Sequence, residues 1–185
     1  ELKWKLRSKL KELHQRIEAT MVYVTHDQTE ALTFADQVIV MEEGVVVQMG
    51  SPVELFERPR HTFVGHFIGS PGMNILPCEV KDSRASFQGH DVKLEGKTTF
   101  TGGKAEIGVR PEFVSLSRTG IPAVVRKVAD VGRRTVIEAM VADVPVNAII
   151  EGKVPEIGSQ VKLAFQADMT RLYVDGWIAT KENGR

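Results

Sequence analysis

Residues 74–177 contain no helical period and consist of short apolar alternations separated by turn residues. The alternating segments are 75–80, 105–109, 113–117, 123–131, 135–141, 144–150, 161–165 and 172–174. Successive side chains of a strand point to opposite faces of a sheet, so each alternation predicts a half-buried strand. Many short strands with regular turns are typical of a small barrel or sandwich. We therefore expect an all-β domain in the second part of the chain.

Residues 1–70 follow a different pattern, which alternates helices with short strands. Apolar residues spaced by three or four positions predict an amphipathic helix over 2–17. The stripe consists of Leu2, Leu6, Leu10, Leu13 and Ile17. A second helix start follows at Ser51, where the serine can cap the helix and Glu54 completes a capping box. The run Gly-Ser-Pro-Gly at 69–72 then ends the helical pattern. These changes predict two domains, at 1–70 and 71–185.

Residues 21–24, Met-Val-Tyr-Val, have strand character and lead directly into the polar turn Thr25-His26-Asp27-Gln28. A helical pattern follows the turn. Thr25 and Asp27 can each cap that helix, because a short side-chain oxygen accepts from its free backbone N–H groups. His26 is thereby expected at the carboxyl end of a strand, where open α/β sheets bind their ligands.

Several segments resemble one known family. Residues 21–31, Met-Val-Tyr-Val-Thr-His-Asp-Gln-Thr-Glu-Ala, resemble the switch-histidine loop of ATP-binding-cassette (ABC) transporter ATPases, and 31–44 are similar to its sugar and polyol importer branch. Residues 67–74, Phe-Ile-Gly-Ser-Pro-Gly-Met-Asn, are similar to the segment that enters the regulatory domain of these importers. Residues 107–112, Ile-Gly-Val-Arg-Pro-Glu, resemble that domain's G-[IV]-R-P-E motif.

The resemblance implies a fold class and a role for the histidine loop. It implies an α/β fragment, the end of an ABC ATPase domain, followed by an all-β regulatory domain of oligonucleotide-binding (OB) barrel type. His26 is implied to contact the γ-phosphate of ATP, a task that suits an imidazole, which can donate to phosphate and titrates near neutrality. Thr25, Asp27 and Gln28 neighbour the nucleotide in this interpretation. Asp27 and Gln28 fix the turn, and whether they also contact a partner subunit stays open.

Other motifs of the family do not occur in these 185 residues. There is no G-x-x-x-x-G-K-[ST] phosphate loop, no L-S-G-G-Q-like signature and no apolar strand ending in Asp-Glu before His26. By resemblance, Leu2 onward matches the helix that follows the family's D-loop. We therefore expect this span to bind ATP and Mg²⁺ poorly and to be inactive in hydrolysis when alone, because those missing groups hold the metal and the phosphates.

The resemblance also implies partners and a location. Two ATPase subunits pair around ATP, their closure drives integral membrane permease subunits, and some regulatory domains bind a phosphotransferase-system protein. Such a subunit is cytoplasmic and peripheral on the inner face of the membrane. The alternative is a stand-alone β-barrel that senses a small anion or sugar, or that pairs subunits. In either case we expect self-association, because strand 20–24 and the leucine stripe lack the sheet that would cover them.

The motif Arg110-Pro111-Glu112 has two interpretations. Arginine can clamp a carboxylate or phosphate through two parallel hydrogen bonds, which favours a ligand-binding or partner-binding loop. A structural role is favoured here, in which proline ends the strand and the arginine contacts the glutamate within the motif.

Composition argues against several other functions. Lys+Arg and Asp+Glu both total 24, so the chain lacks the excess positive charge of a nucleic-acid-binding domain. The basic cluster formed by Arg126, Lys127, Arg133 and Arg134 has few aromatic neighbours for base stacking and is expected to be a solvated β-edge. Histidines are scattered without metal-ligand spacing, so no metal site is expected. Cys78 is the single cysteine, and we expect it to be a small strand residue rather than a nucleophile.

Overall fold

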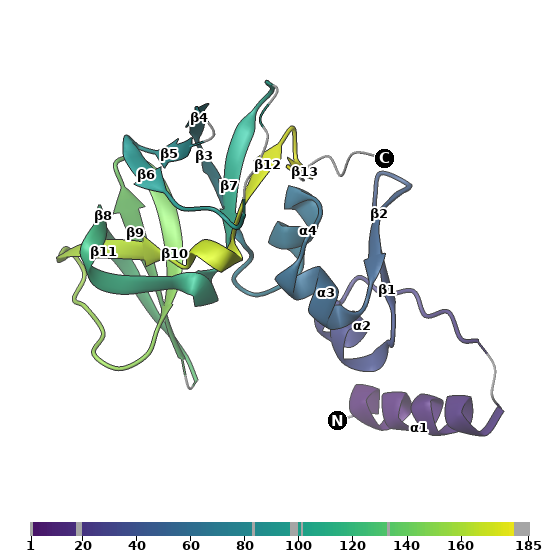
Figure 1. The fold of residues 1–185 in the computed structure, drawn as a ribbon. Coiled ribbons are helices and arrows are strands. Elements are labelled where there is room, and N and C mark those ends of the chain that lie inside the picture. The colour runs from purple at the N-terminus through teal and green to yellow at the C-terminus, as the bar shows by residue number, and fades with distance from the viewer. Residues whose placement is uncertain are drawn as a thin grey trace.

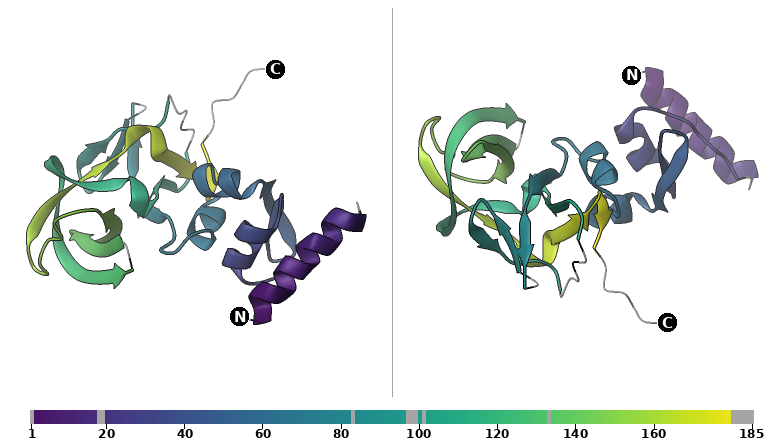
Figure 2. Two further views of the ribbon diagram at one scale, coloured as in Figure 1. Left: turned by 90° about the horizontal axis from the view of Figure 1, so that it is seen from below. Right: turned by 90° about the horizontal axis from the view of Figure 1, so that it is seen from above.

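A computed structural model describes residues 2–17, 20–82, 84–96, 100, 102–132 and 134–179. The described chain has a helical part followed by antiparallel sheets (Figure 1). The elements of the first part are α1 (Leu2–Ile17), α2 (Gln28–Phe34), β1 (Val38–Glu42), β2 (Val45–Gly50), α3 (Pro52–Glu57) and α4 (Thr62–Phe67). Figure 2 shows α1 beside the β1–β2 hairpin, at the end of the molecule opposite the sheets formed after residue 74. No helix in the described part is long and apolar enough to cross a membrane.

Local sequence signals explain where the short helices begin. Ser51 caps α3, where its hydroxyl accepts from the backbone N–H of Glu54, and the Glu54 carboxylate accepts from the backbone N–H of Ser51 at 2.8 Å. This is the predicted capping box. Asp27 caps α2 by accepting from the backbone N–H of Glu30 at 3.2 Å. His61 caps α4, and its Nδ1 accepts from the backbone N–H of Phe63 at 3.2 Å.

The β1–β2 hairpin carries one face of the first core. Its turn residues Glu43 and Gly44 both have positive φ, as a two-residue hairpin turn requires. Val38 and Val40 point inward and pack with the α3 and α4 side chains. The buried members of this core are Val38, Val40, Leu55, Val64 and Ile68.

The predicted strand at 20–24 is wrong. These residues are irregular, and Val22 and Val24 are 85% and 91% exposed. A strand needs a neighbour for its backbone N–H and C=O groups. In the described part, β1 and β2 pair only with each other, and residues 20–24 pair with neither of them. The predicted helix over 2–17 does form, and the stripe residues Leu6, Leu13 and Ile17 are exposed. The side chain of Leu2 lies outside the described ones.

Eleven further strands make up the second part of the described chain. They are β3 (Asn74–Pro77), β4 (Glu79–Lys81), β5 (Arg84–Phe87), β6 (His90–Val92), β7 (Ala105–Val109), β8 (Val114–Val131), β9 (Arg134–Val141), β10 (Val144–Ile150), β11 (Gln160–Phe165), β12 (Thr170–Val174) and β13 (Trp177–Ile178). The sheets have the orders β10-β9-β8-β11, β13-β12-β7-β3 and β4-β5-β6. Two 3₁₀ turns, η1 (Pro111–Phe113) and η2 (Ala167–Met169), precede β8 and β12.

One core joins these three sheets. Its fully buried side chains come from β5, β7, β9, β10 and β11, including Phe87, Ile107, Ile137, Val146 and Leu163. Each such side chain contributes roughly 1.5–3 kcal/mol through removal of apolar surface from water. The predicted all-β domain is therefore built around a continuous apolar interior.

The predicted strands differ from the structure most at two predicted segments, and β5, β6 and β13 were not predicted. The segment 75–80 is divided into β3 and β4 at Cys78, and the segments 113–117 and 123–131 join into β8. The join is possible because β8 bulges between Leu116 and Pro122, which face consecutive residues of β11. Gly120 lies in this bulge with φ of 146°, and a Cβ there would overlap the carbonyl oxygen of Leu163. Only glycine fits this conformation and this approach.

We expect Gly120→Ala to lower the free energy of unfolding by about 3 kcal/mol, because the substitution combines a strained φ with a backbone overlap. The matched control is Gly158→Ala, where φ is 86° but no atom lies within 4 Å of the added Cβ. Its expected cost is about 1 kcal/mol. Urea unfolding followed by circular dichroism measures both losses, and equal losses would contradict the bulge interpretation.

Candidate functional site

Short hydrogen bonds within the loop hold the backbone on both sides of His26. The Thr25 hydroxyl oxygen accepts from the backbone N–H of Asp27 at 3.0 Å. The Asp27 carboxylate accepts from the backbone N–H of Glu30, and its carbonyl accepts from the backbone N–H of Ala31. Short polar side chains close turns in this way by bonding to nearby backbone groups. Asp27 therefore caps α2, as expected, whereas Thr25 orders the turn through the N–H of Asp27 and does not cap the helix.

Glu30 is a buried acid beneath the loop that sequence reasoning did not identify. The residue is 5% exposed. Its Oε2 accepts from the hydroxyl of Thr25 at 2.9 Å and from the phenol of Tyr23 at 3.2 Å. The spacing Asp27-x-x-Glu30 is that of a capping box, which is the signal that could have found it. The carboxylate instead bonds to two residues before His26 and so ties them to α2, which follows it.

The imidazole of His26 is exposed and projects from this ordered loop. In the described part of the chain it forms no hydrogen bond or ion pair. Its ring nitrogens are therefore free to bond to an external group. The neighbouring Gln28 differs in this respect, because its Oε1 accepts from the backbone N–H of Gly69 at 3.0 Å.

Arg110 is buried between the helical part and the β-sheets. The residue is 3% exposed and donates to the carbonyls of Leu55, Phe56, Gly65 and Ile68. In one of these bonds, Arg110 Nη1 donates to the Ile68 carbonyl at 2.6 Å. The guanidinium also lies over the Phe56 ring, with Cζ 4.0 Å from the ring centre. These carbonyls belong to the last turns of α3 and α4, where helical C=O groups lack helical partners and the helix dipole is negative.

The expected contact between Arg110 and Glu112 is not made, and the guanidinium bonds to the helix ends instead. Pro111 begins η1 directly after Arg110. Glu112 Oε2 is buried and has no hydrogen-bond partner among the described residues. Burial lowers the pKa of Arg110 to about 10, while Glu112 acts electrostatically in the opposite direction. The guanidinium therefore stays charged at neutral pH.

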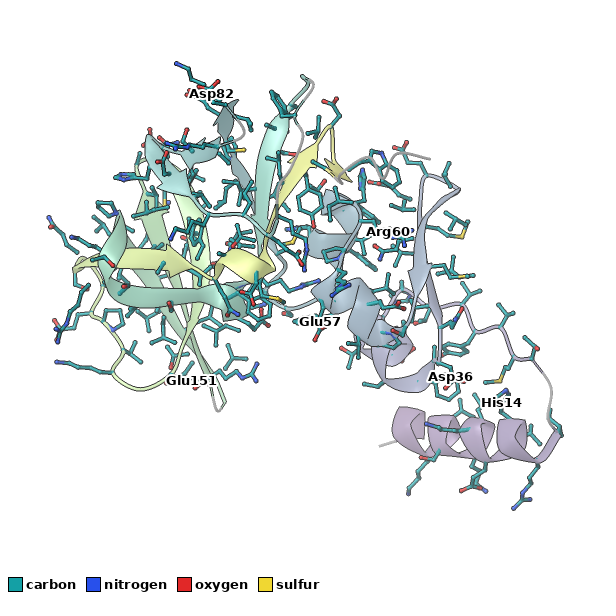
Figure 3. All side chains as sticks on the ribbon, in the orientation of Figure 1. His14, Asp36, Glu57, Arg60, Asp82 and Glu151 are labelled. Carbon is teal, nitrogen blue, oxygen red and sulfur yellow. The ribbon has the colours of Figure 1, made fainter. Side chains whose placement is uncertain are left out.

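Two side chains of β12 complete the joint between the parts. Arg171 Nη1 donates to the carbonyl of Glu57 at 2.6 Å, and Nε forms an ion pair with Glu95 at 2.6 Å. The Tyr173 hydroxyl donates to the carbonyl of Pro59 at 2.8 Å. Figure 3 labels Glu57 at the end of α3 nearest the β-strands. Burial raises the pKa of Tyr173 above its usual value, so the phenol keeps the proton that it donates. Sequence reasoning missed both residues, and their pattern gave no signal beyond a strand.

Other candidate groups remain separate from these contacts. Arg126, Lys127 and Arg134 are exposed, and Lys127 pairs with Glu138 at 3.1 Å; Arg133 lies outside the described residues. Among the described residues, no three His, Cys, Asp or Glu side chains come together as metal ligands. A groove of about 880 Å³ lies on the surface between β8 and β11, and Arg118 and Lys162 are its charged lining residues.

Comparison with known proteins assigns the β part of the chain. A family model described as the MalK OB fold domain matches residues 69–114, and one described as the TOBE domain matches residues 107–172. These two matches overlap at β7 and Arg110 and together contain β3 to β11. The predicted OB-type regulatory domain is confirmed.

Similar whole proteins extend the likeness to the helical part. The chain is 43% identical over 159 residues, 83% of its length, to an uncharacterized ABC transporter ATP-binding protein of Sinorhizobium fredii. It is 39% identical over 155 residues, 80% of its length, to the sn-glycerol-3-phosphate import ATP-binding protein UgpC 2 of Agrobacterium fabrum. It is 42% identical over 130 residues, 66% of its length, to UgpC of Escherichia coli K12. The matched regions cover 43%, 42% and 36% of these relatives, so the chain spans less than half of each.

We expect Arg110→Ala to lower the free energy of unfolding by about 3 kcal/mol or more, because it leaves buried carbonyls without donors. Arg110→Lys recovers only part of this loss, since an ammonium cannot reproduce the planar fork of donors. The control is Arg126→Ala, an exposed arginine whose removal changes stability by about 0.5 kcal/mol or less. Thermal unfolding in the same buffer compares the three variants. Equal stability of the Arg110 and Arg126 alanine variants would contradict the anchoring role.

We expect Cys78 to react slowly with iodoacetamide at pH 8. Burial raises the pKa of its thiol to about 11, and the nearby Glu106 acts in the same direction, so thiolate is scarce. From the usual value of 9.0, this shift lowers the thiolate fraction, and with it the rate, about a hundredfold relative to the urea-unfolded chain. The rate in the folded chain rises with pH up to about 11. Equal rates in the folded and unfolded chain at pH 8 would contradict this prediction.

Proposed function

This chain belongs to the ATP-binding proteins of sugar-importer ABC transporters, and on that premise we propose that it forms the carboxyl-terminal part of a subunit that couples ATP hydrolysis to solute import. Its relatives include proteins named for sn-glycerol-3-phosphate import. The proposed solute class is therefore a sugar, a polyol or a glycerol-phosphate-like compound. The relatives favour this function over a stand-alone ligand-sensing or dimerisation module. We further propose a division near residue 70, with the regulatory domain at 71–185.

The observation that carries the proposal is an exposed imidazole on a loop whose neighbours are all bonded. His26 supplies a free N–H donor, and Thr25, Asp27 and Glu30 hold the backbone around it. A donor fixed before the reaction stabilises developing charge on a phosphate oxygen without further reorganisation. His26 is thus proposed as the switch residue that donates to the γ-phosphate of ATP.

The described residues fit one edge of a nucleotide site and not the whole of it. They offer His26 as a donor, but the 185 residues contain no phosphate loop to cradle ATP. In the intact subunit, ATP with Mg²⁺ supplies the phosphoryl group that is transferred to water. The contribution proposed for this chain is limited to contact with the terminal phosphate and to ordering of the histidine loop. Alone, it is expected to bind nucleotide poorly and to lack turnover.

The proposed partners follow from the importer function. A second ATPase subunit, identical or related, pairs with this one across the nucleotide. Closure of the pair then drives the integral membrane permease subunits. The subunit then works in the cytoplasm, peripheral to the inner face of the membrane. The β-sheet domain is the proposed contact for a regulatory protein.

We expect His26→Ala to lower ATP turnover of the intact subunit about a hundredfold to a thousandfold, because a preorganised donor to the reacting phosphate is lost. The matched control is His90→Ala, since His90 is also exposed but lies on β6 in the regulatory domain. Phosphate release at saturating ATP measures both variants. Turnover by the 185-residue chain itself, or full activity of His26→Ala, would contradict the proposal.

A further inference from the structure

The peptide that joins Ile68 to Gly69 is held from both sides by long side chains. On one side, Gln28 Oε1 accepts from the N–H of Gly69 at 3.0 Å. On the other, Arg110 Nη1 donates to the carbonyl of Ile68 at 2.6 Å. Both groups of a single peptide unit are therefore bonded to side chains, one from α2 and the other from the end of β7.

The peptide between Ile68 and Gly69 is closely packed against neighbouring side chains. Gly69 has φ of 117°, and a Cβ at this position would lie 2.9 Å from Arg110 Nη1. The same Cβ would also approach the Phe56 ring at 3.6 Å. Gly69 is therefore enclosed by the side chains of Arg110 and Phe56. A shift of Arg110 would therefore displace the peptide between Ile68 and Gly69. That displacement would move the Gln28 side chain or break its hydrogen bond with the Gly69 N–H.

Gln28 lies two residues from His26 and at the first position of α2. The turn between them is closed by bonds of Thr25 and Asp27, so it has little freedom to absorb a displacement. Glu30, two residues further along α2, accepts from the hydroxyl of Thr25 at 2.9 Å. A movement of Gln28 is consequently shared by the whole histidine loop.

We propose that Gln28 is a positioning residue that couples the seating of the β-sheet domain on α3 and α4 to the orientation of His26. This inference rests on the proposed function and assigns a regulatory route to the same site. When Arg110 is seated on the helix ends, the peptide at 68–69 holds Gln28 and the loop presents the imidazole. When a regulator shifts the β-sheet domain, the peptide moves and His26 leaves its active orientation.

The test removes the acceptor of Gln28 and then restores it. Gln28→Met keeps the chain length without an oxygen, whereas Gln28→Glu keeps an oxygen that can accept from Gly69. In the intact subunit we expect Gln28→Met to lower kcat about tenfold with KM for ATP nearly unchanged, because the loop is misplaced rather than the nucleotide released. Gln28→Glu should recover most of that loss. The control, Gln160→Met, changes an exposed glutamine of β11 and should leave kcat unchanged.

A second measurement does not depend on turnover. In the 185-residue chain, Gln28→Met should shift the NMR signals of the His26 ring and speed hydrogen exchange of the Gly69 amide, whereas Gln160→Met should do neither. Wild-type His26 signals and wild-type kcat in Gln28→Met would overturn the coupling. If every variant of the intact subunit lacks His26-dependent turnover, the proposed function has failed, and the His26 signals alone decide whether Gln28 positions the loop.

Discussion

The burial of one guanidinium against the ends of two helices is the contact on which the arrangement of this chain depends. The helices α3 and α4 have six residues each, a length at which an isolated helix is unstable in water. Their last carbonyls need partners, and Arg110 supplies a fork of donors to both helices at once. The charge is desolvated by this burial, and the helix dipoles offset part of that cost. The β-sheet domain thereby completes helices that precede it in the chain.

The histidine loop is ordered by a different kind of contact. The printed bonds of Thr25, Asp27 and Glu30 within the loop reach at most seven residues along the chain, so the loop carries its own support. The imidazole of His26 stays outside this network. A rigid frame with one unbonded donor is the arrangement that suits brief contact with a charged ligand, because little ordering entropy is lost on binding. Gln28 connects this local frame to Gly69 through a hydrogen bond that spans 41 residues.

The range of each interaction explains which features could be predicted. The helix start at Ser51 depends on Glu54, three residues away, and the sequence pattern was sufficient. The strand at 20–24 was predicted wrongly, because strand character is realised only with a pairing neighbour. The hydrogen-bond acceptors of Arg110 and Tyr173 are backbone carbonyls 42 to 114 residues away in the sequence, which no local pattern encodes. The motif around Arg110 located the residue correctly but suggested the wrong partner, Glu112.

The hydrogen bonds that join the two parts through Arg110, Arg171 and Tyr173 end on backbone carbonyls of the helical part rather than on its side chains. Arg110, Arg171 and Tyr173 all donate to carbonyl oxygens, and every residue type presents such an oxygen. Substitutions along α3 and α4 can therefore accumulate without removing the acceptors, provided that the helices keep their ends in place. The glycine at 69 is the exception, since its site has no room for a side chain. Such a joint lets the side chains of the two helices diverge while the hydrogen bonds of the attachment are preserved.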